Sequence, residues 1–363
     1  MATKKKQVAE LEEKRLHDYE LVFIINGRLL IVGAMHAVNR LFGGYNLYAL
    51  NPTICYWFVL FVVFLLADLF YVSSRKVKIS ILILFAVTLG MNKTFLNASF
   101  FIHSNAFALV YFCSAIISLY MYSKTGAKSW IYFGSFMLGI ATLVRTDMLI
   151  FSLIYYALLA KVINNDFVLW RNSWIIFFVI SLPWRIATFP LISGANWYVG
   201  ANQILFLLLC NIVFAVVTNI LLYTGKSISW IPKAGLISCA VFFMALTTIS
   251  PSKFYLGWKM FVVYILFGDV WLAAAISVMI IIAVTFIIRE IDEDYGIFTM
   301  SIVFYLFLLF FVVAFAGYEN EDHSAIRMMH HIFPVIVLSL FVGLFNILCI
   351  AANKLEPAVK ANC

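Results

Sequence analysis

Long apolar runs separated by short polar stretches make up almost the whole chain. Each run is close to the roughly 20 residues that one helix needs to cross a bilayer. No alternating pattern typical of transmembrane β-strands competes with these runs, so the backbone must satisfy its hydrogen bonds within helices. We predict an all-α fold, a polytopic transmembrane helical bundle of about 11–12 spans. The candidate spans lie near 53–73, 79–92, 105–122, 130–144, 148–164, 173–190, 203–223, 234–250, 259–288, 297–317 and 332–352.

The segment 21–38 has two interpretations. It is long enough to span, but Asn26, Gly27 and Arg28 interrupt its middle, where a charge is costly. It therefore either crosses the membrane or lies along the interface. The predicted organisation is a charged amphipathic N-terminal segment (1–20), a transmembrane helical domain (21–352) and a short cytoplasmic tail (353–363).

Composition agrees with this pattern. Hydrophobic residues make up 64% of the 363 positions and charged residues only 12%, whereas soluble domains carry about 25% charged residues. A net charge of +8 can indicate nucleic-acid binding, but the Lys and Arg residues lie mostly in short loops, where membrane topology places them. We therefore expect membrane lipids as partners and no nucleic acid.

The basic residues recur in alternate loops and predict an orientation. The basic loops contain Arg75, Lys76, Lys78, Lys124, Lys128, Lys161, Arg171, Lys226 and Lys233. Loops enriched in Lys and Arg are cytoplasmic. The opposite, extracytoplasmic face then collects the loops 39–52, 92–104, 145–147, 190–202, 250–258 and 317–331. A reaction centre is expected on that face, which is richer in His, Asn, Trp and acidic residues.

One candidate site is the tight turn between the spans 130–144 and 148–164. It places Arg145 and Asp147 at the membrane surface. An arginine in this position can bind a phosphate through two parallel hydrogen bonds. The alternative is structural: Arg145 extends to lipid headgroups and Asp147 caps the following helix.

The densest polar cluster lies in the loop 317–331. Its candidate residues are Asp322, His323, Arg327, His330 and His331. Together they offer phosphate binding and proton transfer; the alternative is a solvated loop. Adjacent His330 and His331 cannot both face one ion on a helix, so no metal ligands are predicted and the need for a divalent cation stays open.

A third candidate cluster lies near the N-terminus. Asp18 and Glu20 form a carboxylate pair ahead of Arg28. A carboxylate close to the interface can act as a general base. The alternative is an exposed polar helix.

These stretches, taken in order, resemble the GT-C superfamily of membrane glycosyltransferases, in particular bacterial enzymes that modify lipopolysaccharide or O-antigen from polyprenyl-phosphate sugars. Asp18, Gly27-Arg28 and the loop ending at Leu50-Asn-Pro52 are similar to the family's acidic motif, interfacial helix and entry to the next span. The stretch Gly139 to Asp147 resembles its Gly-Leu-Ala-x-Leu-x-Arg turn. Asp322-His323 with Arg327 and Pro334 resembles its late loop before the closing span.

The chain also departs from the family pattern. Members have a span before the catalytic acid, whereas nothing that can span precedes Asp18, and the loop 39–52 contains no Asp or Glu. If 21–38 is interfacial, the N-terminus is extracytoplasmic and Asp18 can be the base. If 21–38 spans, Asp18 is cytoplasmic and the acid is missing; Lys4, Lys5 and Lys6 favour this second arrangement.

The resemblance implies an inverting glycosyltransferase with a polyprenyl-phosphate sugar as donor and a glycan or lipid as acceptor. The implied phosphate-binding residues are Arg145, Arg327 and Lys93, and the implied catalytic residues are Asp18, Glu20, Asp322 and His323, with Trp197 stacking on a sugar ring. The implied location is a bacterial inner membrane, or the endoplasmic reticulum in a eukaryote. The alternative functions are a transporter or lipid-linked-sugar flippase and a non-catalytic assembly subunit.

Overall fold

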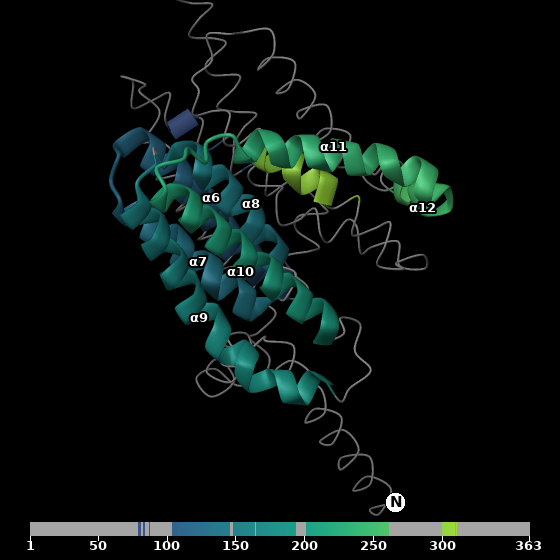
Figure 1. Ribbon diagram of the computed structural model, residues 1–363, viewed down its shortest axis with the longest axis horizontal. Helices are drawn as coiled ribbons and strands as arrows, with labels where there is room; N and C mark the ends of the chain where they lie inside the picture. Colours follow the sequence, from purple (N-terminus) through teal and green to yellow (C-terminus); the bar gives the residue numbers. More distant parts are fainter. Residues whose placement is uncertain are drawn as a thin grey trace, which may run out of the picture.

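The computed structural model describes residues 79–80, 83, 87, 104–145, 148–163, 165–193, 201–260, 300–308 and 310. These residues form helices and the turns between them (Figure 1). The helices are α6 (Ser104–Thr125), α7 (Ser129–Val144), α8 (Met148–Val162), α9 (Phe167–Ser193), α10 (Ala201–Tyr223), α11 (Ile231–Ile249) and α12 (Pro251–Met260). The all-α prediction is therefore confirmed for the part of the chain that the structure describes.

Predicted and observed helices correspond from α6 to α11, with ends that differ by a few residues. The largest extension is at the start of α9, which begins at Phe167 instead of near 173. Asp166 accounts for it, because its carboxylate accepts a hydrogen bond from the backbone N–H of Leu169 at 3.0 Å. This contact satisfies one of the amide groups that a helix N-terminus leaves without an internal partner.

Three helical stretches are long and apolar enough to cross a membrane, judged by length and composition. They are Phe167–Ala187, Ile204–Tyr223 and Ile231–Ile249, and α7 and α8 are shorter apolar helices. Much of the predicted set of spans lies outside the described residues, as do the segment 21–38 and the limits of the three predicted regions. The number of spans stays a prediction.

The predicted loop 250–258 is instead largely the short helix α12. Ser250 has a non-helical backbone (φ −146°, ψ 72°) and ends α11. Pro251 follows as the first residue of α12, a position where the missing proline N–H costs nothing and its fixed φ suits a helix. The polar residues that suggested a loop therefore belong to a short, less apolar helix.

Helix α7 packs between α6 and α9, and its glycines face its neighbours. A Cβ atom at Gly134 would meet the hydroxyl groups of Ser118 on α6 and Tyr155 on α8, and one at Gly139 would lie 2.9 Å from Cβ of Ile180 on α9. Small residues allow helix backbones to approach closely in an apolar environment. The last turns of α7 therefore begin where this helix packs closely against α9.

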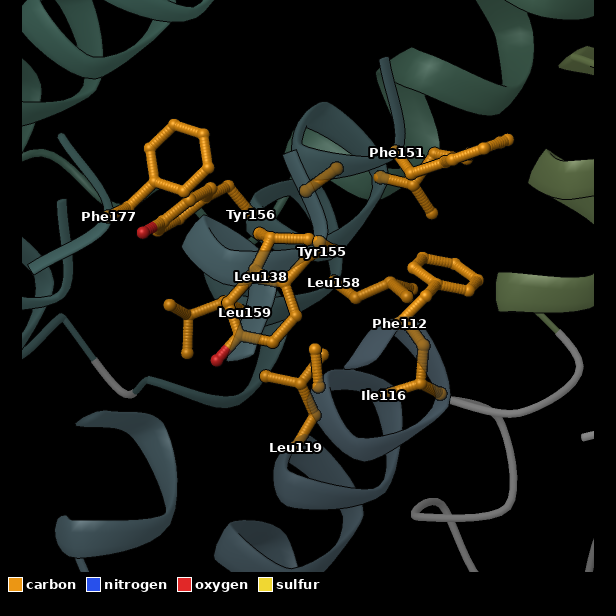
Figure 2. Packing of buried hydrophobic residues seen from close by; sticks show 14 of the residues in the cluster. Phe112, Ile116, Leu119, Leu138, Phe151, Tyr155, Tyr156, Leu158, Leu159 and Phe177 are labelled. Carbon is orange, nitrogen blue, oxygen red and sulfur yellow. The ribbon is translucent and has the colours of Figure 1, made fainter. Parts of the chain in front are cut away.

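Aromatic side chains fill the core of the described helices. Figure 2 shows Tyr155, Tyr156 and Phe177 among the buried residues. The ring of Tyr156 stacks on Trp174, with centroids 3.5 Å apart. Rings of this size bury much apolar surface and fix the relative rotation of α8 and α9. This packing joins α8 to the first half of α9.

Candidate functional site

Helix α7 ends at Val144, and Arg145 follows in an extended conformation (φ −146°, ψ 134°). The Arg145 N–H donates to the Ala141 carbonyl at 2.9 Å, and the Arg145 carbonyl accepts from the Met148 N–H at 3.2 Å. Because α8 begins at Met148, the connection contains only three residues, 145–147. The prediction that Arg145 lies between two helices is confirmed, and residues 146 and 147 lie outside the described residues.

A second arginine, Arg185 on α9, reaches the same helix end. Its side chain is only 3% exposed. The guanidinium group donates a hydrogen bond to the backbone carbonyl of Thr142, three residues before Arg145. The structure therefore brings two arginines to the last turn of α7, one from the connection to α8 and one from a neighbouring helix.

The last turn of α7 favours positive charge. The final carbonyl groups of a helix have no partner within the helix, and the helix dipole is negative at this end. Thr142 contributes one of these carbonyls, and its own fully buried hydroxyl donates to Gly139 at 2.7 Å. The Arg185 guanidinium therefore stabilises the helix end at a carbonyl three residues before Arg145.

Gly139 is part of the same arrangement. Because a Cβ atom there would lie 2.9 Å from Cβ of Ile180, the missing side chain allows α9 to lie close against α7. Ile180 precedes Arg185 by five residues on α9. The close approach of the two backbones thus puts the Arg185 side chain within reach of the α7 end.

We call Arg145, Arg185 and the Thr142 carbonyl the α7–α9 arginine site. Guanidinium groups are planar, always charged and suited to phosphate and carboxylate oxygens. Among the described residues the single carboxylate is Asp166, in the turn between α8 and α9, which is at the other end of α9 from Arg185. The described part of the site therefore carries positive charge at the end of α7.

Arg145 is the one predicted site residue that lies within the described part of the chain. The others lie outside it: Asp18, Glu20, Arg28, Lys93, Asp147, Trp197, Asp322, His323, Arg327, His330 and His331. The predicted convergence of Arg145 and Arg327 on one pocket therefore stays a prediction. No group of three or more potential metal ligands occurs within the described residues.

The sequence analysis missed Arg185, although a signal was present. Arg185 lies inside the apolar run 173–190, and an ionisable residue within a membrane span is a functional candidate by default. The placement of Arg185 beside Thr142 depends on how α9 packs against α7, which the sequence pattern does not specify.

The α7–α9 arginine site combines a buried arginine on a helix carbonyl with a second arginine directly after the helix end. No protein-family model, no curated protein and no solved structure matches the chain.

Proposed function

We propose that the protein is an integral membrane glycosyltransferase of the GT-C type. It transfers a sugar from a polyprenyl-phosphate donor to a glycan or lipid acceptor on the extracytoplasmic face. The observation that carries this proposal is the pair of arginines at the end of α7, Arg145 at the helix end and Arg185 on the Thr142 carbonyl. A lipid-linked phosphate is the ligand that combines an anionic group with an apolar tail.

Exposed apolar surface supports the membrane location. Phe206, Val213 and Ile220 on α10 are 65%, 59% and 56% exposed. They are seven residues apart and so share one face of the helix. A continuous apolar face of this kind is unfavourable in water and normal against lipid tails. The proposed compartment is a bacterial inner membrane, or the endoplasmic reticulum in a eukaryote.

In the proposed reaction the acceptor hydroxyl attacks the anomeric carbon from the side opposite the phosphate. The bond between the anomeric carbon and the phosphate oxygen breaks, and its electron pair leaves with the polyprenyl phosphate. Arg145, with Arg327 and Lys93, stabilises the charge that grows on this leaving group. Asp18 accepts the acceptor proton, assisted by Glu20, Asp322 or His323, and inversion at the anomeric carbon follows from the single displacement.

Arg185 acts as a positioning residue in this proposal. Its low exposure and its bond to Thr142 favour a role in fixing the turn that carries Arg145. A fixed donor stabilises a developing charge better than a mobile one, because no reorganisation is needed during the reaction. The long-range field of the Arg185 charge adds to that of Arg145.

Transport of a lipid-linked sugar is the competing function. It needs polar groups along a path through the bundle. The buried polar pair between α8 and α10, Ser152 and Asn211, is instead bonded internally: the Asn211 amide donates to the Leu149 and Leu207 carbonyls at 2.8 and 2.9 Å. This pattern favours a structural role for the pair and supports the enzyme.

The test is sugar transfer by the purified full-length protein in proteoliposomes, with radiolabelled polyprenyl-phosphate sugars and candidate acceptors. Wild-type protein should form product. Loss of a group that stabilises the leaving charge should slow transfer about 100-fold or more, so Arg145→Ala and Arg327→Ala should both fail to transfer at a measurable rate. Lys259→Ala, an exposed cation on α12, is the control and should retain wild-type transfer.

An equal transfer rate in Arg145→Ala and wild type would contradict the proposed role of this residue. Movement of the labelled lipid across the bilayer without any sugar transfer would contradict the enzyme and support the transporter.

A further inference from the structure

Three turns of the described chain lie together at one end of the bundle (Figure 1). They connect α6 to α7, α8 to α9 and α10 to α11. Nζ of Lys128 in the first turn lies 2.7 Å from Oδ2 of Asp166 in the second. The ring of Phe167, beside the second turn, lies 5.9 Å from that of Tyr223, at the start of the third. The turns therefore form one surface.

This surface is strongly cationic. Its basic residues, in the turns and in the adjoining turns of helix, are Lys124, Lys128, Lys161, Arg171, Lys226 and Lys233. Asp166 is the one carboxylate among the described residues, and it pairs with Lys128. We call this set of basic residues the cationic surface.

The cationic surface borders exposed aromatic and apolar side chains. Tyr223 and Trp230, on either side of Lys226, are 79% and 54% exposed. Ile220, one turn before Tyr223, is 56% exposed. Tyrosine and tryptophan are enriched where lipid tails meet headgroups. Lys226 thus lies between two exposed aromatic residues of the kind that is enriched at a membrane interface.

The turn between α10 and α11 holds its groups in a defined arrangement. Gly225 has φ +75°, a conformation that favours glycine, and Lys226 follows it. The Trp230 indole N–H donates to the Ser227 carbonyl at 3.0 Å, and the hydroxyl oxygens of Ser227 and Ser229 are 3.0 Å apart. Two hydroxyls and an indole are thus held together in the turn that follows Lys226, and charged groups form the stronger hydrogen bonds to phosphate.

We propose that the cationic surface binds anionic phospholipid headgroups of the leaflet that it faces, with Lys226 and Lys233 as its principal contacts. The complementary charge selects anionic over zwitterionic lipid, and the flanking aromatic rings select a headgroup in a bilayer over a free phosphate. The proposal rests on the membrane location in the proposed function but not on glycosyl transfer.

The test is native mass spectrometry of the full-length protein in neutral detergent, titrated with phosphatidylglycerol or phosphatidylcholine. Each cation near an anionic lipid surface raises the affinity about fivefold. The Lys226→Gln/Lys233→Gln variant should therefore bind phosphatidylglycerol about 25-fold more weakly, with phosphatidylcholine binding unchanged. The control, Lys253→Gln/Lys259→Gln, removes the same charge from α12 and should bind phosphatidylglycerol nearly as well as wild type.

A second measurement needs no variant. At 1 M salt the Debye length falls to about 3 Å, so the preference of the wild-type protein for phosphatidylglycerol should largely disappear. Three results would each overturn the proposal. The first is equal binding of both lipids, and the second is a loss of affinity in the α12 control as large as in the Lys226/Lys233 variant. The third is a preference for phosphatidylglycerol that persists at 1 M salt. Displacement of the lipid by inorganic phosphate at equal concentration would overturn its choice of ligand. Sugar transfer, measured separately, reports on the enzyme alone.

Discussion

The guanidinium group of Arg185 on α9 donates a hydrogen bond to the backbone carbonyl of Thr142, in the last turn of α7. Both residues are buried, at 3% and 0% exposed. This contact ties together the two helices that position Arg145, because Thr142 precedes Arg145 by three residues. It connects the packing of the bundle to the proposed chemistry.

The first prediction is that Arg185→Gln lowers the stability of the protein. Hydrogen bonds to charged groups contribute about 1.5–3 kcal/mol, and the shorter glutamine cannot reach the Thr142 carbonyl from the same backbone position. The measurement is the thermal unfolding transition in detergent. Arg171→Gln, the same change at an exposed position of α9, is the control and should unfold close to wild type. Equal transitions for Arg185→Gln and wild type would show that the contact contributes nothing.

The second prediction concerns the close approach of α7 and α9. Gly139→Val should destabilise the protein by about 1–3 kcal/mol, because its side chain must displace Ile180 or separate the helices. Truncating the neighbour should recover part of this loss, so Gly139→Val/Ile180→Ala should be more stable than the sum of the two single changes predicts. Additive effects in the double-mutant cycle would argue against a direct contact.

The third prediction tests the polar pair that joins α8 to α10. The hydroxyl of Ser152 and the side-chain carbonyl of Asn211 are 2.5 Å apart, and both residues are fully buried. Polar contacts between membrane helices contribute about 0.6 kcal/mol on average and up to about 1.7 kcal/mol. A cycle of Ser152→Ala and Asn211→Ala should give a coupling energy in this range; zero coupling would mean that each residue bonds only to backbone carbonyls.

The fourth prediction is a dependence of stability on pH. The hydrogen bond from Lys128, followed by that from the Leu169 N–H, holds the pKa of Asp166 below its ordinary value of 3.8. A lowered pKa in the folded state gives stability that is present above 3.8 and lost as the pH falls through the lowered value. The same contact raises the pKa of Lys128 above 10.5, so its contribution is lost as the pH rises through that higher value.

The Asp166→Asn change removes the ion pair with Lys128 but keeps a side chain that can cap α9. Asparagine caps a helix about as well as aspartate, whereas alanine costs about 1 kcal/mol. The difference in unfolding temperature between wild type and Asp166→Asn should be constant near neutral pH and shrink in acid. A difference that grows as the pH falls would have the wrong sign for this pair.

The sequence pattern predicted much of the described fold because apolar runs of a given length encode helices directly. The turn at Gly126 and the helix end before Arg145 follow from polar residues between such runs. The sequence pattern did not predict which sides of the helices are buried, because a helix that is apolar on all sides carries no amphipathic signal. That burial depends on shape, for example on Gly139 meeting Ile180.

The candidate site was predicted in one part and missed in another. Arg145 was found because a charge stands out in a turn between apolar runs. Arg185 joins it through packing between α7 and α9, and no spacing in the sequence relates positions 142 and 185. The remaining predicted site residues lie outside the described part of the chain, so their roles stay predictions.

The central claim is that the end of α7 binds a lipid-linked phosphate, and binding can be measured without turnover. The full-length protein in neutral detergent would be titrated with polyprenyl phosphate and with the corresponding polyprenol, whose tail is identical. We expect binding of the phosphate at least about tenfold tighter than that of the alcohol, a difference of about 1.4 kcal/mol, and loss of this preference in Arg145→Gln. Equal affinity for both lipids, or an unchanged preference in Arg145→Gln, would contradict the account.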